Sequence, residues 1–146
     1  MSVSTKPIFA PMRQIEHLGI AVTDLETAVP LWEALLKSPC YKTETVDREG
    51  VSTAFFRIGE SKIELLEGIR PDSAITKFIE KKGPGFHHVA FAVDDIEAEA
   101  ARLQAEGFEI IGDGVPKPGA DNKLVLFLHP KSAGGLLVEL CQERVG

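Results

Sequence analysis

The amino-acid sequence predicts an α+β fold in which two tandem βαβββ modules form one curved mixed sheet. The first observation is a repeated phrase: His17-Leu-Gly-Ile-Ala-Val-Thr-Asp-Leu-Glu returns 71 residues later as His88-Val-Ala-Phe-Ala-Val-Asp-Asp-Ile-Glu. The second is that the hydrophobic periodicity follows the same order in both halves, from a strand to a helix and then to three strands. Each module leaves one sheet face uncovered, so we expect the two halves to close it together.

The first repeat covers about residues 14–68. The segment 15–22 predicts a strand, and Thr23-Asp24 offers an N-cap for a helix over about 24–36. Pro30 lies inside this helical pattern, so we expect the helix to begin late or to bend. Runs separated by short turns predict three further strands, at 41–47, 51–58 and 61–67.

The second repeat covers about residues 86–142 and follows a helical linker at 69–85. It predicts a strand, a helix that ends at Gly107, and three strands. The expected bounds are 86–93 for the first strand, 95–106 for the helix, and 108–112, 123–128 and 136–142 for the others. The linker itself predicts a helix over 73–82. We therefore expect one domain over residues 14–142 rather than two independent units.

Composition excludes several classes of function. The net charge of −6 argues against a nucleic-acid surface, and no apolar run is long enough to span a membrane. The first 14 residues contain no apolar signal core and no arginine-rich amphipathic pattern, so we expect a cytoplasmic protein, or a mitochondrial matrix protein if the source is eukaryotic. The two cysteines, Cys40 and Cys141, are expected to be reduced and buried.

Two histidines and two glutamates occupy corresponding places in the repeats. His17 and His88 lie in the first strand of each half, whereas Glu64 and Glu139 lie in a late apolar strand of each half. A buried carboxylate on an apolar strand is costly unless it is paired or bound to a metal. Two imidazoles and two carboxylates suit a divalent transition-metal ion that keeps positions open for substrate oxygens. The sequence therefore predicts that the curved sheet surrounds a metal site.

Two other histidines have different expected roles. His87 points away from His88 if its strand is regular, which indicates a packing residue or one that supports a ligand. His129 opens the loop His129-Pro-Lys-Ser-Ala-Gly-Gly, for which we considered a plain hairpin and an anion contact. In the second case Lys131, Ser132 and neighbouring backbone amides would contact phosphate.

These phrases resemble the vicinal oxygen chelate superfamily and, within it, the methylmalonyl-CoA epimerase family. The matching text is the His17 phrase, Lys62-Ile-Glu-Leu-Leu-Glu, Gly85-Phe-His-His-Val-Ala-Phe-Ala-Val-Asp-Asp-Ile and His129-Pro-Lys-Ser-Ala-Gly-Gly-Leu-Leu-Val-Glu-Leu. The resemblance implies a vicinal oxygen chelate fold, a homodimer, and interconversion of (R)- and (S)-methylmalonyl-CoA. It also implies a divalent metal held by His17, Glu64, His88 and Glu139, with cobalt as the usual ion and zinc, manganese or nickel as alternatives.

The resemblance also implies proton transfer on both faces of a carbon through a metal-stabilised enolate. Glu139 is expected to transfer the proton on one face of this carbon. Some relatives carry a glutamate where this chain has Thr53, which cannot act as a base. Glu49, just before that turn, is interpreted as an exposed turn residue, so Glu64 is the better candidate for the second face. In some relatives the residue at the Glu64 position is a glutamine.

Two alternatives stay open at the level of sequence. One is another metal-dependent enzyme of the superfamily, such as a lactoylglutathione lyase or a different acyl-CoA epimerase, because a conserved chelating site does not define the substrate. The other is a non-catalytic module that binds a small molecule. Retention of all four ligands counts against this second alternative, since sequestering a molecule needs a pocket but no ion.

Overall fold

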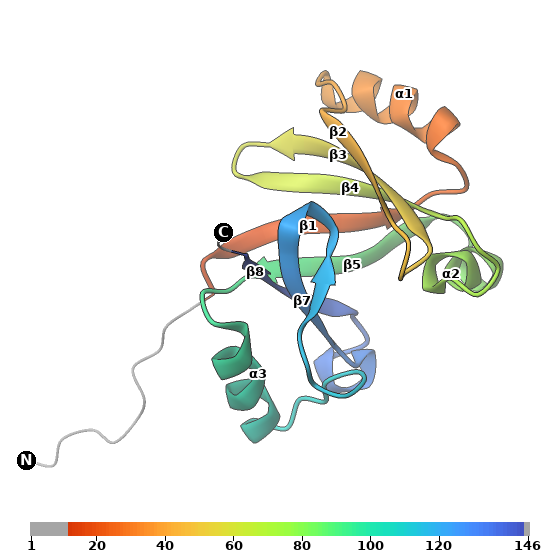
Figure 1. The fold of residues 1–146 in the computed structure, drawn as a ribbon. Helices are drawn as coiled ribbons and strands as arrows, with labels where there is room; N and C mark the ends of the chain where they lie inside the picture. Colours follow the sequence, from red (N-terminus) through yellow and green to blue (C-terminus); the bar gives the residue numbers. More distant parts are fainter. Residues whose placement is uncertain (1–11, 145–146) are drawn as a thin grey trace, which may run out of the picture.

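The computed structural model describes residues 12–144; the amino-terminal segment that we interpreted as lacking a targeting signal lies almost entirely outside them. Eight strands form one mixed sheet in the order β2-β3-β4-β1-β5-β8-β7-β6. The sheet is strongly curved (Figure 1). The elements of the first half are β1 (Gln14–Ala21), α1 (Leu25–Leu36), β2 (Lys42–Val46), β3 (Val51–Ile58) and β4 (Ser61–Gly68). The predicted α+β class and curved mixed sheet are confirmed.

Helix α2 (Ala74–Lys82) leads from the first half into the second. The later elements are β5 (Gly85–Ala92), α3 (Ile96–Ala105), β6 (Lys117–Gly119), β7 (Lys123–Leu128) and β8 (Val138–Glu143), with short 3-10 helices η1 (Ala120–Asn122) and η2 (Pro130–Ala133). Helix α1 begins at Leu25 and continues through Pro30, so the expected late start is wrong.

The two strands that carry the repeated histidines are neighbours at the centre of the sheet. β1 and β5 are antiparallel, with His17 opposite Ala90 and Gly19 opposite His88. On the outer sides, β4 runs parallel to β1 and β8 runs parallel to β5. The two strands that carry Glu64 and Glu139 therefore flank the histidine strands, one on each side.

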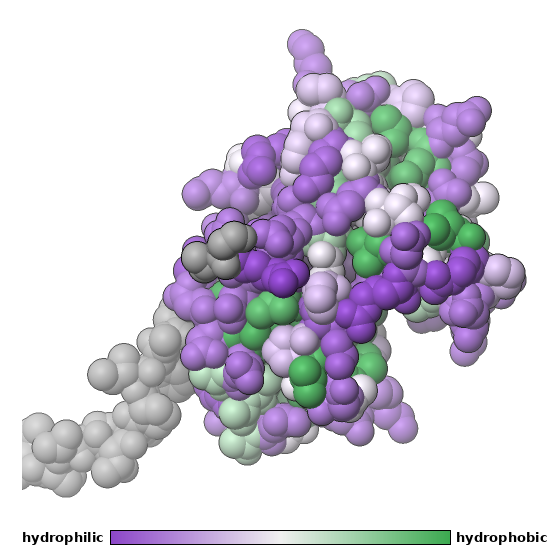
Figure 2. All heavy atoms as spheres, in the orientation of Figure 1, coloured by the Kyte–Doolittle hydropathy of each residue, from purple (hydrophilic) through white to green (hydrophobic). Residues whose placement is uncertain are grey.

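Separate apolar cores lie beneath α1 and α3, which cover the outside of the sheet (Figure 1). Helix α2 instead packs against Val51 and Leu66 through Ile75. The core under α1 includes Ala54, Phe56 and Leu65, all fully buried. The core under α3 includes Ile96 and Leu140. In the view of Figure 2 the apolar residues form small separate patches among polar ones. Among the described residues, no helix has both the length and the hydropathy needed to cross a bilayer.

The prediction of a strand near 108–112 is wrong. This segment contributes only one isolated bridge, between Ile110 and Leu128, and the edge strand β6 lies later in the chain. Ile110 is buried in the core under α3, so the apolar run reflects packing against that helix rather than strand pairing. Gly112 and Gly114 then adopt φ values of 86° and 79°, which turn the chain before it reaches β6.

Candidate metal centre and adjoining cavity

His17, His88 and Glu139 converge on the concave face of the sheet. The Nε2 atoms of the two histidines lie 3.0 Å apart, and Glu139 Oε1 lies 3.3 Å from His17 Nε2 and 2.8 Å from His88 Nε2. One possible ligand atom from each of the three residues lies within 4.8 Å of the others. All three side chains are buried, so the donor atoms are held in a fixed arrangement away from solvent.

Glu64 approaches the other side of the His17 ring. Its Oε2 lies 3.1 Å from His17 Nδ1 and 3.6 Å from Lys62 Nζ, and Glu64 does not belong to the group of three converging ligands. The structure thus brings three predicted ligands together and places the fourth beside them. Glu64 as a ligand stays a prediction.

The charges of this cluster fit a bound cation. Burial by itself lowers the pKa of His17, but the carboxylates of Glu64 and Glu139 outweigh it and raise the pKa to about 10. Burial would raise the pKa of Glu139, yet His17 and His88 hold it well below its usual value. Burial raises the pKa of Glu64 in spite of the nearby His17. A donor set of imidazoles and carboxylates that favours nearby positive charge fits a divalent metal ion.

The position of His88 depends on the absence of a side chain at Gly19. A Cβ atom added to Gly19 would overlap the imidazole ring of His88. On its other side, the ring of Phe127 meets that of His88 edge-on, with ring centroids 5.8 Å apart. The ring is therefore seated between the β1 backbone and an aromatic side chain from β7, which limits its rotation.

A buried network of charged residues lies next to the cluster, and it was not expected from the sequence. Lys62, whose side chain is 3% exposed, places Nζ 3.1 Å from Glu16 Oε1 and 2.6 Å from Asp121 Oδ2. Glu16 Oε1 in turn lies 2.8 Å from His17 Nδ1. Lys62 lies two residues before Glu64, so strand alternation alone places both on one face. Asp121 comes from a loop of the other half, for which the sequence offers no signal.

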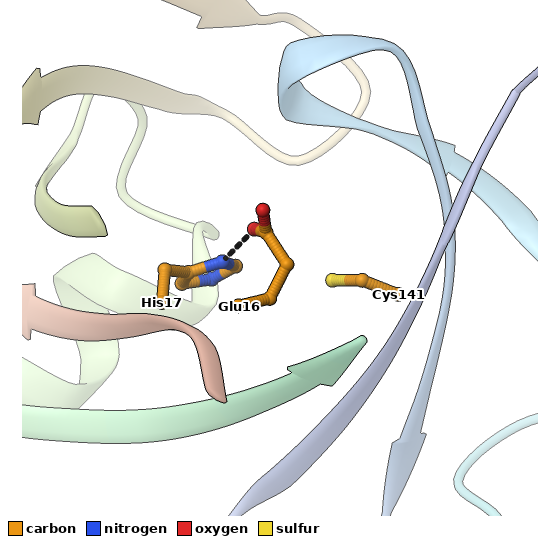
Figure 3. Close-up of side chains that lie close together, drawn as sticks. All are labelled: Glu16, His17 and Cys141. Carbon is orange, nitrogen blue, oxygen red and sulfur yellow. Dashed lines mark hydrogen bonds and ion pairs between the residues drawn. The ribbon is translucent and has the colours of Figure 1, made fainter. Parts of the chain in front are cut away.

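Cys141 contacts the same cluster from β8. Figure 3 shows its sulfur near Glu16 and His17, with the Glu16 carboxylate directed at the His17 ring. Burial, together with the charge of Glu139, raises the pKa of this thiol far above its usual value. The thiol therefore keeps its proton and donates a hydrogen bond to Glu139 Oε2, which lies 3.0 Å from the sulfur. Both cysteines are free, as expected, but only Cys141 is buried; Cys40 is half-buried, so the expected burial is wrong for it.

A cavity of about 480 Å³ opens onto the cluster. Its size falls in the range of small-molecule sites. Glu64, Glu139, His88 and His87 line it. Glu49 lines it too, although it is an exposed turn residue, as expected. Partial enclosure of the Glu49 carboxyl, together with the charge of Glu139, raises its pKa. The remaining lining residues are mostly apolar, among them Val51, Leu66, Ile75, Val125, Phe127 and Leu137.

Lys131 and Ser132 lie on η2, and neither belongs to the lining of this cavity. The Ser132 hydroxyl donates to the backbone oxygen of His129 at 2.9 Å and accepts from the backbone N–H of Glu109 at 3.0 Å. It therefore ties the loop to the segment after α3. Lys131 is exposed at the surface. Their predicted contact with substrate stays a prediction.

Comparison with known proteins defines the class of this fold and site. A model of the glyoxalase, bleomycin resistance protein and dioxygenase superfamily matches residues 16–127. The chain belongs to this superfamily, whose other name is vicinal oxygen chelate, and the fold implies a divalent metal.

Within that superfamily, the resemblance to methylmalonyl-CoA epimerases is confirmed. The chain is 40% identical over 130 residues to the ethylmalonyl-CoA/methylmalonyl-CoA epimerase of Cereibacter sphaeroides, covering 88% of this chain and 97% of the relative. It is similar in structure to the methylmalonyl-CoA epimerase of Streptomyces coelicolor in complex with 2-nitronate-propionyl-CoA, with a TM-score of 0.87 and 35% identity over 92% of this chain and 97% of that one. Another methylmalonyl-CoA epimerase structure, in complex with methylmalonyl-CoA and NH4+, gives the same values.

Proposed function

We propose that this protein is an isomerase that interconverts the two epimers of methylmalonyl-CoA with the help of a divalent metal ion. The observation that carries the proposal is the convergence of His17, His88 and Glu139 beside a cavity of about 480 Å³, whose lining includes His88 and Glu139. The cavity is large enough for the acyl part of a thioester. The similarity to enzymes named for this reaction supports the choice of substrate.

His17, His88, Glu139 and Glu64 would hold the metal, with cobalt as our first choice and zinc, manganese or nickel as alternatives. Once bound, such an ion supplies Lewis-acid stabilisation of the negative charge that develops on substrate oxygens. The protein keeps its donors in place by burial, and the apolar wall of the cavity strengthens electrostatic interactions at the reacting carbon.

Glu139 is the proposed base on one face of the α-carbon. Its low pKa keeps it ionised at neutral pH, so it is ready to accept a proton. Cys141 donates to Oε2, which leaves Oε1 on the side of the two histidines. For the opposite face we propose Glu64, which also lines the cavity and faces Nδ1 of His17, whereas Glu139 faces Nε2.

The test of the overall function is deuterium uptake. Apoprotein reconstituted with cobalt is mixed with (R)- or (S)-methylmalonyl-CoA in deuterated water, and α-deuterium and epimer composition are followed. We expect deuterium incorporation together with conversion to the other epimer. Turnover of a glutathione hemithioacetal without exchange in methylmalonyl-CoA would instead indicate a lactoylglutathione lyase.

Glu64→Gln separates ligation from proton transfer, because an amide oxygen still binds a metal but cannot carry the proton. We expect this variant to retain cobalt and to lose at least about 100-fold in epimerisation. Glu49→Gln is the matched control in the same cavity and is expected to stay near the wild-type rate. A large loss of epimerisation in Glu49→Gln, together with a near-wild-type rate in Glu64→Gln, would show that Glu49 transfers the proton on the second face.

We further propose that the protein acts as a homodimer in the cytoplasm, or in the mitochondrial matrix if its source is eukaryotic. Light scattering of the purified protein tests the first point, with twice the chain mass of 15.9 kDa expected.

A further inference from the structure

The central pair of strands contains two irregularities at equivalent positions of the repeat. Between β1 and β5, Ile15 pairs with Phe91 and His17 with Ala90, which leaves Glu16 without a partner in the register. Further along the pair, Gly19 pairs with His88 and Ile20 with Phe86. His87 is therefore left without a partner too. Each unpaired residue directly precedes one of the repeated histidines.

Such a bulge changes the direction of one side chain. In a regular strand, neighbouring side chains point to opposite faces, but an extra residue lets two consecutive side chains share a face. Glu16 and His17 accordingly lie together, with Glu16 Oε1 2.8 Å from His17 Nδ1. His87 and His88 also lie together, with their Nδ1 atoms 2.8 Å apart. This explains why the expectation that His87 points away from His88 is wrong.

In both bulges the unpaired residue contacts Nδ1 of the histidine that follows it. Glu64 Oε2 also lies 3.1 Å from Nδ1 of His17. The two Nε2 atoms face each other at 3.0 Å beside Glu139. A neutral imidazole whose Nδ1–H donates a hydrogen bond carries its lone pair on Nε2. The acceptors at Nδ1 therefore determine which nitrogen is available to a metal.

Each acceptor is itself held in place. Lys62 Nζ lies 3.1 Å from Glu16 Oε1, which fixes the carboxylate from behind. The ring of Phe78, on α2, meets the ring of His87 edge-on with centroids 4.9 Å apart. The two acceptors differ in chemistry, one a carboxylate and the other an imidazole, although they occupy equivalent positions.

We propose that Glu16 and His87 are positioning residues that use the paired bulges to fix the tautomers of His17 and His88, so that both Nε2 atoms face one metal ion. The inference rests on the proposed metal centre and is independent of the substrate. Residues that orient ligating histidines in this way typically affect metal affinity strongly.

The test compares variants that remove the acceptor with variants that keep one. Glu16→Leu and His87→Phe remove the acceptor that each bulge supplies, with little change in volume. Glu64, which lies 3.1 Å from His17 Nδ1, is a proposed ligand of the metal and would therefore not replace Glu16 in the loaded protein. Glu16→Gln and His87→Asn retain an acceptor oxygen. Cobalt affinity is measured by competition with a chromophoric chelator. We expect the first pair to bind about 10- to 100-fold more weakly than the wild type and the second pair to stay within about threefold of it.

Long-range ¹H–¹⁵N spectra of the zinc-loaded wild type, labelled at histidine, give a second readout. We expect Nδ1 of both histidines to be protonated and Nε2 to be the nitrogen on the metal. Metal bound through Nδ1, or unchanged affinity in both Glu16→Leu and His87→Phe, would overturn the inference while leaving the metal centre intact. A wild type that binds no divalent ion would overturn the metal centre and this inference together. Glu16→Leu also removes a partner of Lys62 and so could fail to fold. In that case the cobalt affinity of His87→Phe and the spectrum of the wild type test the inference.

Discussion

Gly19, which carries only a hydrogen atom in place of a side chain, leaves the space that the ring of His88 occupies. Gly19 faces His88 across the central strand pair, and the equivalent residue of the other repeat, Ala90, faces His17. A Cβ atom at Gly19 would overlap the imidazole of the histidine opposite it, whereas Ala90 carries a Cβ atom opposite His17. The two halves of the site are therefore not interchangeable, although their sequences are alike.

Replacing Gly19 with alanine should displace the His88 ring, because the new Cβ would occupy its place. We expect cobalt affinity to fall about 10-fold or more, which is the scale seen when a ligand loses its support. Ala90→Gly is the matched control, expected to lower stability by about 1 kcal/mol and to leave cobalt affinity nearly unchanged. Equal loss of affinity in both variants would contradict the role given to Gly19.

Metal uptake should release protons at neutral pH. The pKa of His17 is about 10 in the metal-free protein, because Glu64 and Glu139 outweigh the effect of burial. A metal ligand must be deprotonated, so we expect about one proton to be displaced per ion at pH 7 and affinity to rise with pH up to about 10. Calorimetry in buffers of different ionisation enthalpy measures this number. A heat that is independent of the buffer would show that His17 is already neutral.

At the scale of elements, the duplication repeats the start of the helices as well as the ligands. Asp24 accepts from the backbone N–H of Thr27 at 2.7 Å, and Asp95 accepts from that of Ala98 at 3.1 Å. The N–H of the first residue of each helix donates to a side chain of the last strand of its half, Glu67 for α1 and Gln142 for α3. Each helix is therefore connected through its first residue to the strand that carries a proposed ligand, Glu64 on β4 or Glu139 on β8.

Asp24→Ala should therefore lower the free energy of unfolding by about 1 kcal/mol, the usual contribution of an N-cap. Asp24→Ser keeps an acceptor oxygen and should restore most of this loss. Urea denaturation followed by circular dichroism measures both variants. A full loss in the serine variant would show that the cap hydrogen bond is not the cause.

For the whole molecule, one loop of the second half joins the curved sheet to the first half. Asp121, on η1, contacts Lys62 of β4 and Lys42 of β2, each at 2.6 Å. Its backbone N–H also donates to Glu44 Oε1 at 3.0 Å. These contacts connect the loop after edge strand β6 to the opposite edge of the sheet, so the two repeats are linked there as well as through β1 and β5.

Asp121→Asn tests this link, since asparagine tolerates the left-handed backbone at this position. We expect the free energy of unfolding at pH 7 to fall by about 1–2 kcal/mol, because both lysines lose a charged acceptor. Burial alone would raise the pKa of Asp121, but Lys42 and Lys62 lower it to about 2. The difference from wild type should therefore be full above about pH 4 and should disappear as the pH falls through about 2. Denaturation at several pH values checks this, and a difference that persists at the lowest pH would contradict it.

Much of the fold followed from the sequence because period and turn residues are local signals. The repeated phrase identified the central strands, and Asp24 and Asp95 marked the helix starts. The segment near Ile110 was misjudged because an apolar run under a helix has the same composition as a strand. The place of Glu49 in the cavity could not be predicted, since it depends on how far the two halves curve toward each other.

By itself, the sequence determined the α+β class, the duplication and the residues proposed to bind a metal, because these depend on residue types at regular spacings. Only the tertiary structure decided how those residues face one another. The bulges that place Glu16 and His87 at Nδ1 depend on strand register, and the position of Asp121 depends on closure between the two halves. Strand register and the closure of the two halves depend on contacts between residues that are far apart in the sequence, so local sequence patterns do not predict them.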